Sequence, residues 1–253
     1  MARRRLLVNE VLVVGCGGLI YHALPRLANI VRVNKRTRLT LVDNDVVEER
    51  NGARQWGTDG QSKVGAAQMG LVQLGVEPDD TTTHVLRVDE RFRLGQVWLP
   101  QGAGLRVVVS LPDNHLARIH VHEAVAQWGG SVWEIMAGNS VEGGMVSTSE
   151  WTGRAWAWDW LDLHPDIATG AAAEREAERR TRRNSCSRAR GRRAQQTARG
   201  NALTATLWLD SLEAVLGGEE RPNERTWSRG ETDVGLGGVE AVLGVMYFTR
   251  ERE

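Results

Sequence analysis

The chain has 253 residues, of which 41% are hydrophobic and 25% are charged, a composition typical of a globular domain. Its 32 basic residues balance 32 acidic residues, so no overall field favours nucleic acid or an anionic membrane surface. No apolar run approaches the ~20 residues of a membrane-spanning helix, and the basic N-terminus meets glycines too early for a signal peptide. We therefore expect a cytoplasmic protein that acts away from membranes and nucleic acids.

Strand-like and helix-like segments alternate through the first half of the chain. Short apolar runs that end in glycine or a polar residue predict buried strands at 11–14, 39–43, 85–88, 107–111, 132–137 and 144–151. Segments with helical periodicity predict helices at 19–29, 64–74 and 114–128. Such alternation indicates βαβ units. The sequence predicts an α/β fold with a Rossmann-like, mainly parallel sheet and flanking helices.

The pattern changes near residue 152. A tryptophan-rich stretch is followed by Ala171–Arg193, which carries nine arginines and three glutamates. We interpret 152–194 as an exposed, arginine-rich excursion, partly helical around 171–183, within one domain that spans residues 1–253. A helix is expected at Gln195–Leu216, where Gly217 and Gly218 end it, and a strand at Val239–Phe248.

A glycine-rich turn, Gly15-Cys16-Gly17-Gly18, follows the first expected strand and opens the first helix. Glycines at this place allow backbone N–H groups to approach a phosphate at a helix N-terminus. Many strand–helix turns carry glycines without binding a ligand, so this turn alone leaves nucleotide binding open. Asp43 and Asp45, at the end of the second strand, fit either a ribose-binding site or an ordinary turn.

Three further polar positions carry candidate chemistry. Arg54 and Lys63 are suitable cations for a triphosphate, and Lys63 is notable because the chain contains 30 arginines and only two lysines, Lys35 and Lys63. Asp113, followed by Asn114, ends a predicted strand. An aspartate there can hold Mg²⁺ beside a nucleotide or cap the next helix.

Taken in order, these residues resemble the ThiF/MoeB/ubiquitin-activating family of adenylating enzymes. The family pattern runs GxGGxG, DxD, NxxRQ, a lysine and DN. The matching residues here are Gly15, Gly17 and Gly18, Asp43 and Asp45, Asn51, Arg54 and Gln55, Lys63, and Asp113 with Asn114. Segments 133–144 and 184–187 are most like the ThiF-family protein of bacterial PRTRC gene clusters, and the resemblance covers roughly residues 8–216.

The resemblance implies a ThiF-type fold and an adenylyltransferase activity. It implies that ATP binds at the carboxyl edge of the sheet, with Asp43 on the ribose, with Asn51, Arg54 and Lys63 on the phosphates, and with Asp113 holding Mg²⁺. The implied substrate is the C-terminal carboxylate of a small β-grasp protein, either ubiquitin-like or sulfur-carrier-like. The implied assembly is a homodimer, in which an N-terminal arginine among residues 3–5 reaches the partner's site.

Cys186 is a candidate acceptor thiol for a thioester, because some family members place a catalytic cysteine in the crossover. Four arginines at 182, 183, 188 and 190 surround it, and nearby cations favour the reactive thiolate. The alternative is an enzyme that stops at the acyl adenylate.

Two other functions stay open. A catalytically inactive nucleotide-binding subunit is suggested by Ile20, which replaces a glycine of the family pattern, and by the short segment before the first strand. A Rossmann NAD or FAD oxidoreductase would share the glycine turn, but it has no use for Arg54, Lys63 and Asp113.

Several features are interpreted as structural. Cys16 is expected to be a small packing residue, and the tryptophans between 151 and 160 to cover a core. His115, His120 and His122 lie on one expected helix, but no acidic partner completes a ligand set, which argues against a metal site. Cys16 and Cys186 lack CxxC spacing, so neither a zinc site nor a disulfide framework is expected.

Overall fold

The computed structural model describes residues 8–34, 36–49, 57–98, 103–139, 143–183, 198–218, 223–229, 240–242 and 245–251. Its strands are β1 (Val8–Val14), β2 (Thr37–Val42), β3 (Thr81–His84), β4 (Ala103–Ser110), β5 (Val132–Asn139), β6 (Gly143–Trp151), β7 (Trp156–Trp158), β8 (Asn223–Arg229), β9 (Glu240–Val242) and β10 (Val245–Glu251). Its α-helices are α1 (Gly18–Val33), α2 (Lys63–Gln73), α3 (His115–Ala126), α4 (Trp160–Leu163), α5 (Pro165–Arg183) and α6 (Ala198–Gly217), and two short 3-10 helices are η2 (Pro78–Asp80) and η3 (Leu94–Gln96).

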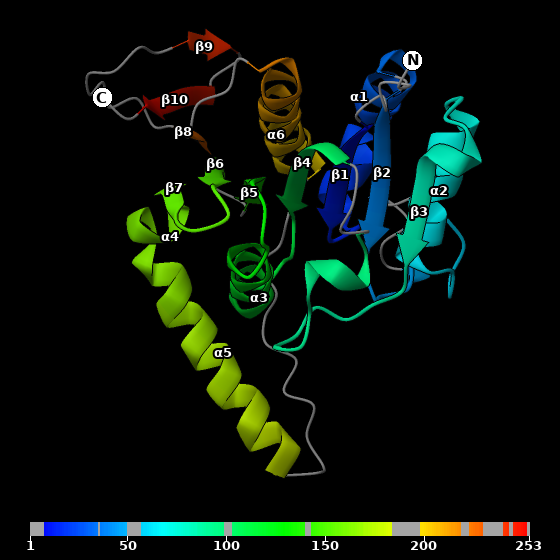
Figure 1. Ribbon diagram of the computed structural model, residues 1–253. Coiled ribbons are helices and arrows are strands. Elements are labelled where there is room, and N and C mark those ends of the chain that lie inside the picture. Colours follow the sequence, from blue (N-terminus) through cyan, green and yellow to red (C-terminus); the bar gives the residue numbers. More distant parts are fainter. Residues whose placement is uncertain are drawn as a thin grey trace, which may run out of the picture.

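All these strands join one mixed sheet, in the order β3-β2-β1-β4-β5-β6-β8-β10-β9, with β7 paired to β6 (Figure 1). The strands from β3 to β5 are parallel, whereas β6 and the strands beyond it pair antiparallel. This arrangement confirms the predicted α/β class and its Rossmann-like parallel half.

The central strand β1 separates two hydrophobic cores. Val11 and Val13 face the core that α1, α2 and α6 cover, while Leu12 and Val14 face the core beneath α3. Successive side chains of a strand point to opposite faces of a sheet, so a strand buried on both faces must be apolar at every position. This explains the continuous apolar run Val11–Val14 within β1.

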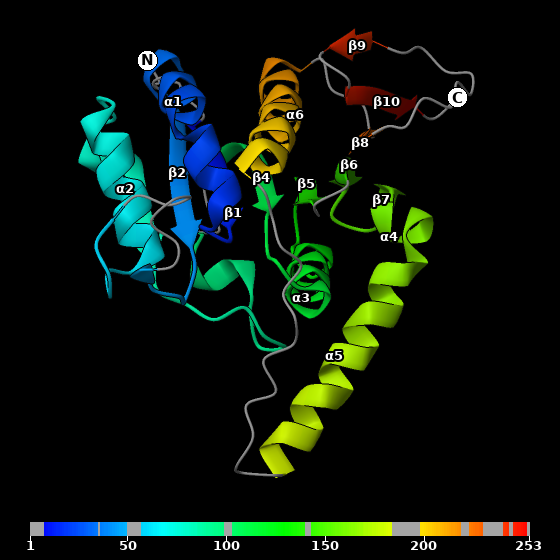
Figure 2. The same ribbon diagram turned by 180° about the vertical axis from the view of Figure 1, so that it is seen from behind.

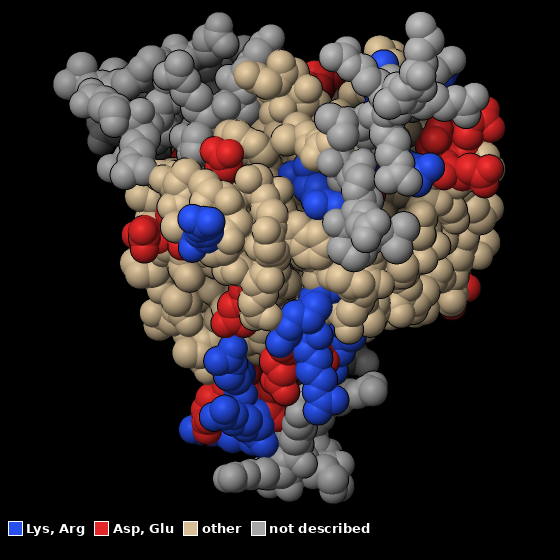
Figure 3. Space-filling model, viewed as in Figure 1, with Lys and Arg blue, Asp and Glu red and all other residues tan. Residues whose placement is uncertain are grey.

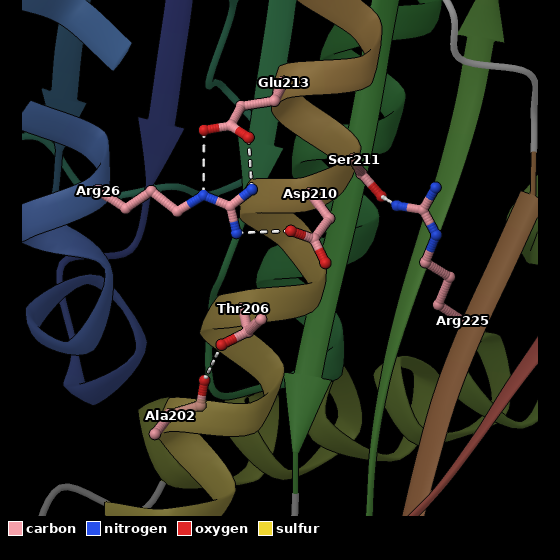
Figure 4. Close-up of polar contacts among 7 residues, drawn as sticks. All are labelled: Arg26, Ala202, Thr206, Asp210, Ser211, Glu213 and Arg225. Atoms are coloured by element: carbon pink, nitrogen blue, oxygen red, sulfur yellow. Dashed lines mark hydrogen bonds and ion pairs between the residues drawn. The ribbon is translucent and has the colours of Figure 1, made fainter. Parts of the chain in front are cut away.

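Helices α1 and α6 lie side by side on the first face (Figure 2). Figure 4 shows Arg26 of α1 between Asp210 and Glu213 of α6, with Nη1 of Arg26 2.5 Å from Oδ1 of Asp210. These side chains are partly exposed to solvent, so the ion pairs add little stability. Burial of Leu24, Leu27 and the fully buried Trp208 holds the two helices together.

The N-terminal half of helix α5 packs against the body of the protein, and its distal half projects from it. The packed half corrects the expectation of an exposed excursion. Ile167 and Ala171, in its N-terminal half, pack with residues of α3 in a third buried cluster. Its distal half projects from the body, and basic and acidic side chains interleave there (Figures 1 and 3). Arg180 pairs with Glu176 one turn away, which makes this half the solvated face that its composition suggests.

Most expected elements lie within a few residues of the observed ones, but the strand expected at 85–88 is wrong. The strand is Thr81–His84, and its pairing with β2 ends where β2 ends, at Val42. The chain beyond His84 has no strand neighbour at that point, and Val85 is 65% exposed. The expected tail strand, 239–248, corresponds to two strands, β9 and β10. No sequence pattern predicted β8.

No helix in the described ranges combines the length and hydrophobicity needed to cross a membrane. The expected structural role of the tryptophans is confirmed for Trp160, which is fully buried, and for Trp151, which is 8% exposed.

A buried polar network anchors α3 to the sheet. Nδ1 of His122 lies 2.7 Å from Oε2 of Glu134 on β5, and its Nε2 lies 3.3 Å from Oδ1 of Asp159. The indole of Trp160 also donates to Glu134, and the ring of Trp156 stacks on His122. The histidine therefore has acidic partners, contrary to the sequence-based interpretation, but they come from other elements. Both ring nitrogens of His122 contact carboxylates, so the network ties α3 to β5 and to Asp159, the N-cap residue of α4.

We predict that this network makes stability depend on pH. Burial alone would lower the pKa of His122, but the carboxylates of Glu134 and Asp159 outweigh it and raise that pKa to about 9. The unfolded-state pKa is about 6.5, so the stabilisation is fully present below pH 6.5 and is lost as the pH rises through 9. Denaturant titrations should show the free energy of unfolding falling by up to about 3 kcal/mol over that window.

The matched variants are His122→Gln and His22→Gln, because His22 is exposed on α1. His122→Gln should lower stability and remove the pH dependence, whereas His22→Gln should retain the wild-type slope. An unchanged slope in His122→Gln would show that the imidazolium does not form in the folded protein.

Candidate nucleotide-binding site

Three neighbouring strands end together at the carboxyl edge of the sheet. Val14 of β1 is in register with Val42 of β2 and with Ser110 of β4. The N–H of Gly15 donates to the carbonyl of Val42 at 2.8 Å, and the N–H of Leu111 donates to the carbonyl of Val14 at 2.8 Å. Open α/β sheets bind ligands at this edge, where the connections on either side of a strand diverge to opposite faces.

The turn between β1 and α1 needs its first glycine. Gly15 has a φ of +95°, and a Cβ there would lie 2.9 Å from the backbone carbonyl of Leu111. Gly17, the N-cap residue of α1, has no described atom within 4 Å of its Cβ position, and no side chain among the described residues caps the helix. An uncapped helix N-terminus favours an anion.

Ile20, which departs from the family pattern, does not crowd this turn. Its side chain is completely buried in the core that α1 shares with α2 and α6.

Asp43 ties the glycine turn to the end of β2. Its Oδ2 accepts the N–H of Cys16 at 2.7 Å, and its Oδ1 accepts the N–H of Asp45 at 2.7 Å. Burial raises the pKa of Asp43 above its ordinary value, although the two backbone hydrogen bonds and the charge of Lys63 oppose the shift. The carboxylate is therefore a structural brace, and each of its oxygens has a further lone pair that can accept a ribose hydroxyl.

Lys63 lies at the start of α2, beside this brace. Its Nζ is 2.9 Å from Oδ2 of Asp45, and its backbone N–H donates to the carbonyl of Asp45 at 3.0 Å. Ser62 caps the helix by accepting the N–H of Gly65. Lys63 is only 8% exposed, so this cation is held close to the aspartates rather than extended into solvent.

Cys16 is packed inside the turn and is completely buried. Burial raises the pKa of its thiol, and the charge of Asp43 raises it further. The side chain therefore stays a neutral thiol, which confirms the expected packing role.

Asp113 is exposed just beyond β4, and the structure separates the two roles considered for it. The side chain of the next residue, Asn114, caps α3 by accepting the N–H of Ala117 at 2.7 Å. The cap is thus filled without Asp113, whose carboxylate lies at the same edge as the glycine turn.

The other candidate residues, Asn51, Arg54, Gln55 and Cys186, lie outside the described residues. Gly15, Gly17, Gly18, Asp43, Asp45, Lys63 and Asp113 all lie at the ends of β1, β2 and β4 or in the segments that follow them.

Two polar residues near this edge were not predicted from the sequence. Asn201 of α6 is fully buried, and its Nδ2 would be 2.3 Å from a Cβ on Gly18. Arg118 of α3 reaches the end of β5 at Gly138. Arg118 could have been found from its position one turn after the Asn114 cap, whereas no local signal marks Asn201.

No protein-family model and no curated protein sequence matches the chain. Solved structures do match it. The structure of Escherichia coli MccB with AMPCPP and selenomethionine-labelled MccA has a TM-score of 0.56 and 16% identity, over 86% of this chain and 60% of that one. The fold is the ThiF-type adenylation fold.

Two further MccB structures agree. The complex of E. coli MccB with ATP has a TM-score of 0.56 and 16% identity, over 86% of this chain and 59% of the MccB chain. E. coli MccB alone has a TM-score of 0.56 and 17% identity, over 86% and 58%. This chain thus spans about three fifths of the length of the structures it matches.

Proposed function

We propose that this protein uses ATP to adenylate the C-terminal carboxylate of a peptide or small protein. The observation that carries the proposal is the convergence of an open helix N-terminus, the Asp43–Asp45–Lys63 cluster and Asp113 at three adjacent strand ends. The fold supports it, because the matching MccB structures include complexes with ATP and with AMPCPP.

Each residue has a role that its surroundings support. The open N-terminus of α1 would hold phosphate oxygens, and Asp43 would accept a ribose hydroxyl. Lys63 would neutralise the charge that develops on the phosphates. The family pattern assigns Arg54 and Asn51 to the phosphates and includes Gln55 among the nucleotide-binding residues.

Asp113 fits a magnesium site of the usual kind. Mg²⁺ commonly binds one or two carboxylates and completes its coordination with substrate phosphates and water. The ion would neutralise the phosphate charge.

The reaction is a substitution at the α-phosphorus. A carboxylate oxygen of the substrate forms a bond to that phosphorus, the bond to the bridging oxygen of the β-phosphate breaks, and pyrophosphate leaves with the electron pair. The product is an acyl adenylate, and no proton transfer is required.

The finer assignments rest on the family pattern. We assign the substrate to the β-grasp carriers, ubiquitin-like or sulfur-carrier-like, and the chain to the ThiF-family proteins of PRTRC clusters. The assembly would be a homodimer. The matching complex of MccB with MccA supports a peptide or protein partner in general.

Asp113 gives the first test. Asp113→Ala should abolish carrier-dependent exchange of labelled pyrophosphate into ATP, because the Mg²⁺ ligand is lost. The fold should be retained, since the side chain is exposed. Thermal unfolding checks the fold, and exchange at the wild-type rate in this variant would refute the metal assignment.

The two lysines provide a matched pair. Lys63→Ala should reduce exchange by ~10²–10³-fold, the typical cost of losing one preorganised charge-stabilising group. Lys35→Ala should leave it nearly unchanged. Equal and small effects in the two variants would mean that Lys63 only supports Asp45.

Cys186 decides whether the reaction continues to a thioester. We propose that its thiolate attacks the acyl carbon of the adenylate, forming a thioester bond and expelling AMP. After incubation with ATP, Mg²⁺ and the carrier, a non-reducing gel should show a covalent adduct that thiol reductant removes and that Cys186→Ser lacks. Full carrier activation and transfer by Cys186→Ser would show that the enzyme stops at the adenylate.

A further inference from the structure

A second cationic side chain lies at the carboxyl edge of the sheet. Arg118 is partly buried in the first turns of α3, and its Nε donates to the carbonyl of Pro112 at 3.2 Å. Pro112 directly precedes Asp113, so the guanidinium is anchored beside the candidate magnesium ligand.

The end of β5 is shaped to receive this guanidinium. A Cβ on Gly138 would lie 2.3 Å from Nη2 of Arg118, 2.9 Å from Cζ and 3.3 Å from Nη1. Any side chain at 138 would displace the group. The guanidinium thus packs against the glycine backbone, bridging the ends of β4 and β5.

The terminal N–H groups of Arg118 lack a matching acceptor among the described residues, because the Pro112 carbonyl is its only hydrogen-bond partner there. Asp113 and Glu174 influence it electrostatically, but neither forms an ion pair with it within that part of the chain. Glu174 is already engaged, since its carboxylate accepts the N–H groups of His115 and Leu116 at 3.3 and 2.8 Å.

Burying the charged guanidinium of Arg118 without a matching acceptor costs free energy unless an anion binds to it. Burial lowers the pKa of Arg118, which shows that its charge is incompletely solvated. With Nε fixed, the two terminal nitrogens still present a planar fork, and that fork matches the two oxygens of a carboxylate.

We propose that Arg118 binds the C-terminal carboxylate of the acyl substrate and holds it beside the nucleotide, a role that rests on the proposed adenylation function. The substrate class is a peptide tail with a free C-terminus. Arg118 and Gly138 together select the acid, because an amide presents only one acceptor oxygen and no negative charge.

The test compares a short peptide that ends in Gly-Gly as the free acid and as the C-terminal amide. Binding of each fluorescently labelled peptide is measured by polarisation with saturating AMPCPP, whose methylene bridge between the α- and β-phosphates blocks adenylyl transfer. The affinity for ATP is measured separately by calorimetry. The wild-type protein should prefer the acid roughly 10- to 100-fold, the range expected for hydrogen bonds to a charged group.

Arg118→Met should reduce the preference for the acid to near unity and leave ATP affinity within about twofold. Arg118→Lys keeps the charge but loses the fork, so a partial preference is expected. Gly138→Ala keeps the arginine and displaces it, and it too should lose the preference. Arg175→Met, which removes an exposed arginine of α5, should behave as wild type.

Other outcomes overturn the proposal. A wild-type protein without acid preference, or Arg118→Met that keeps it, would exclude the carboxylate site. Reduced ATP affinity in Arg118→Met with acid preference retained would assign the arginine to a phosphate instead. Failure of the wild type to bind ATP would refute the proposed function, while the acid-to-amide ratio, measured without AMPCPP, would still judge Arg118.

Discussion

The site depends on one carboxylate, that of Asp43. It accepts backbone N–H groups from the glycine turn and from Asp45, and so it fixes the end of β2 against the start of α1. Asp45 in turn holds Lys63 at the first residue of α2. Without these hydrogen bonds, the N-terminus of α1 and the ammonium group of Lys63 would not be held at fixed positions relative to one another. The cost is partial desolvation, which appears as the raised pKa of Asp43.

Helix α3 organises the other half of the edge in the same way. Its cap is the side chain of Asn114, and Arg118 reaches the end of β5 one turn later. One turn further, His122 is locked to Glu134 within the sheet. Arg118 and His122 lie on the same helix. The ion pair between His122 and Glu134 therefore fixes the position along the sheet at which Arg118 contacts Gly138. Loss of one charge of a buried ion pair is destabilising, and here the pair also fixes this position.

The sequence predicted the parallel half of the fold well because its signals are local. Val11–Val14 of β1 is a continuous apolar run, and Gly15 to Gly18 end it where the backbone must turn, so strand and turn could be identified together. Asp43 and Asp113 were placed at strand ends by the same reasoning, and Lys63 at the start of a helix. The roles of these residues with ATP stay predictions, since the structure shows only that they gather at one edge.

What the sequence could not reveal depends on contacts between distant elements. Glu134 and Asp159 are remote in sequence from His122, and no sequence pattern near the histidine predicts these contacts. The strand at Thr81–His84 was misplaced because the more hydrophobic Val85–Val88 follows it, yet register with β2 decided the outcome. Ile167 and Ala171 of α5 are buried because they pack with α3, a contact that the arginine-rich composition of this segment does not indicate.

The central claim is that the edge formed by β1, β2 and β4 binds a nucleoside triphosphate, and competition calorimetry with ATP·Mg²⁺ and NADH tests it directly. We predict saturable binding of ATP that depends on Mg²⁺, with NADH unable to displace it. Tight binding of NADH by protein that ignores ATP would contradict the account and make the chain a Rossmann oxidoreductase.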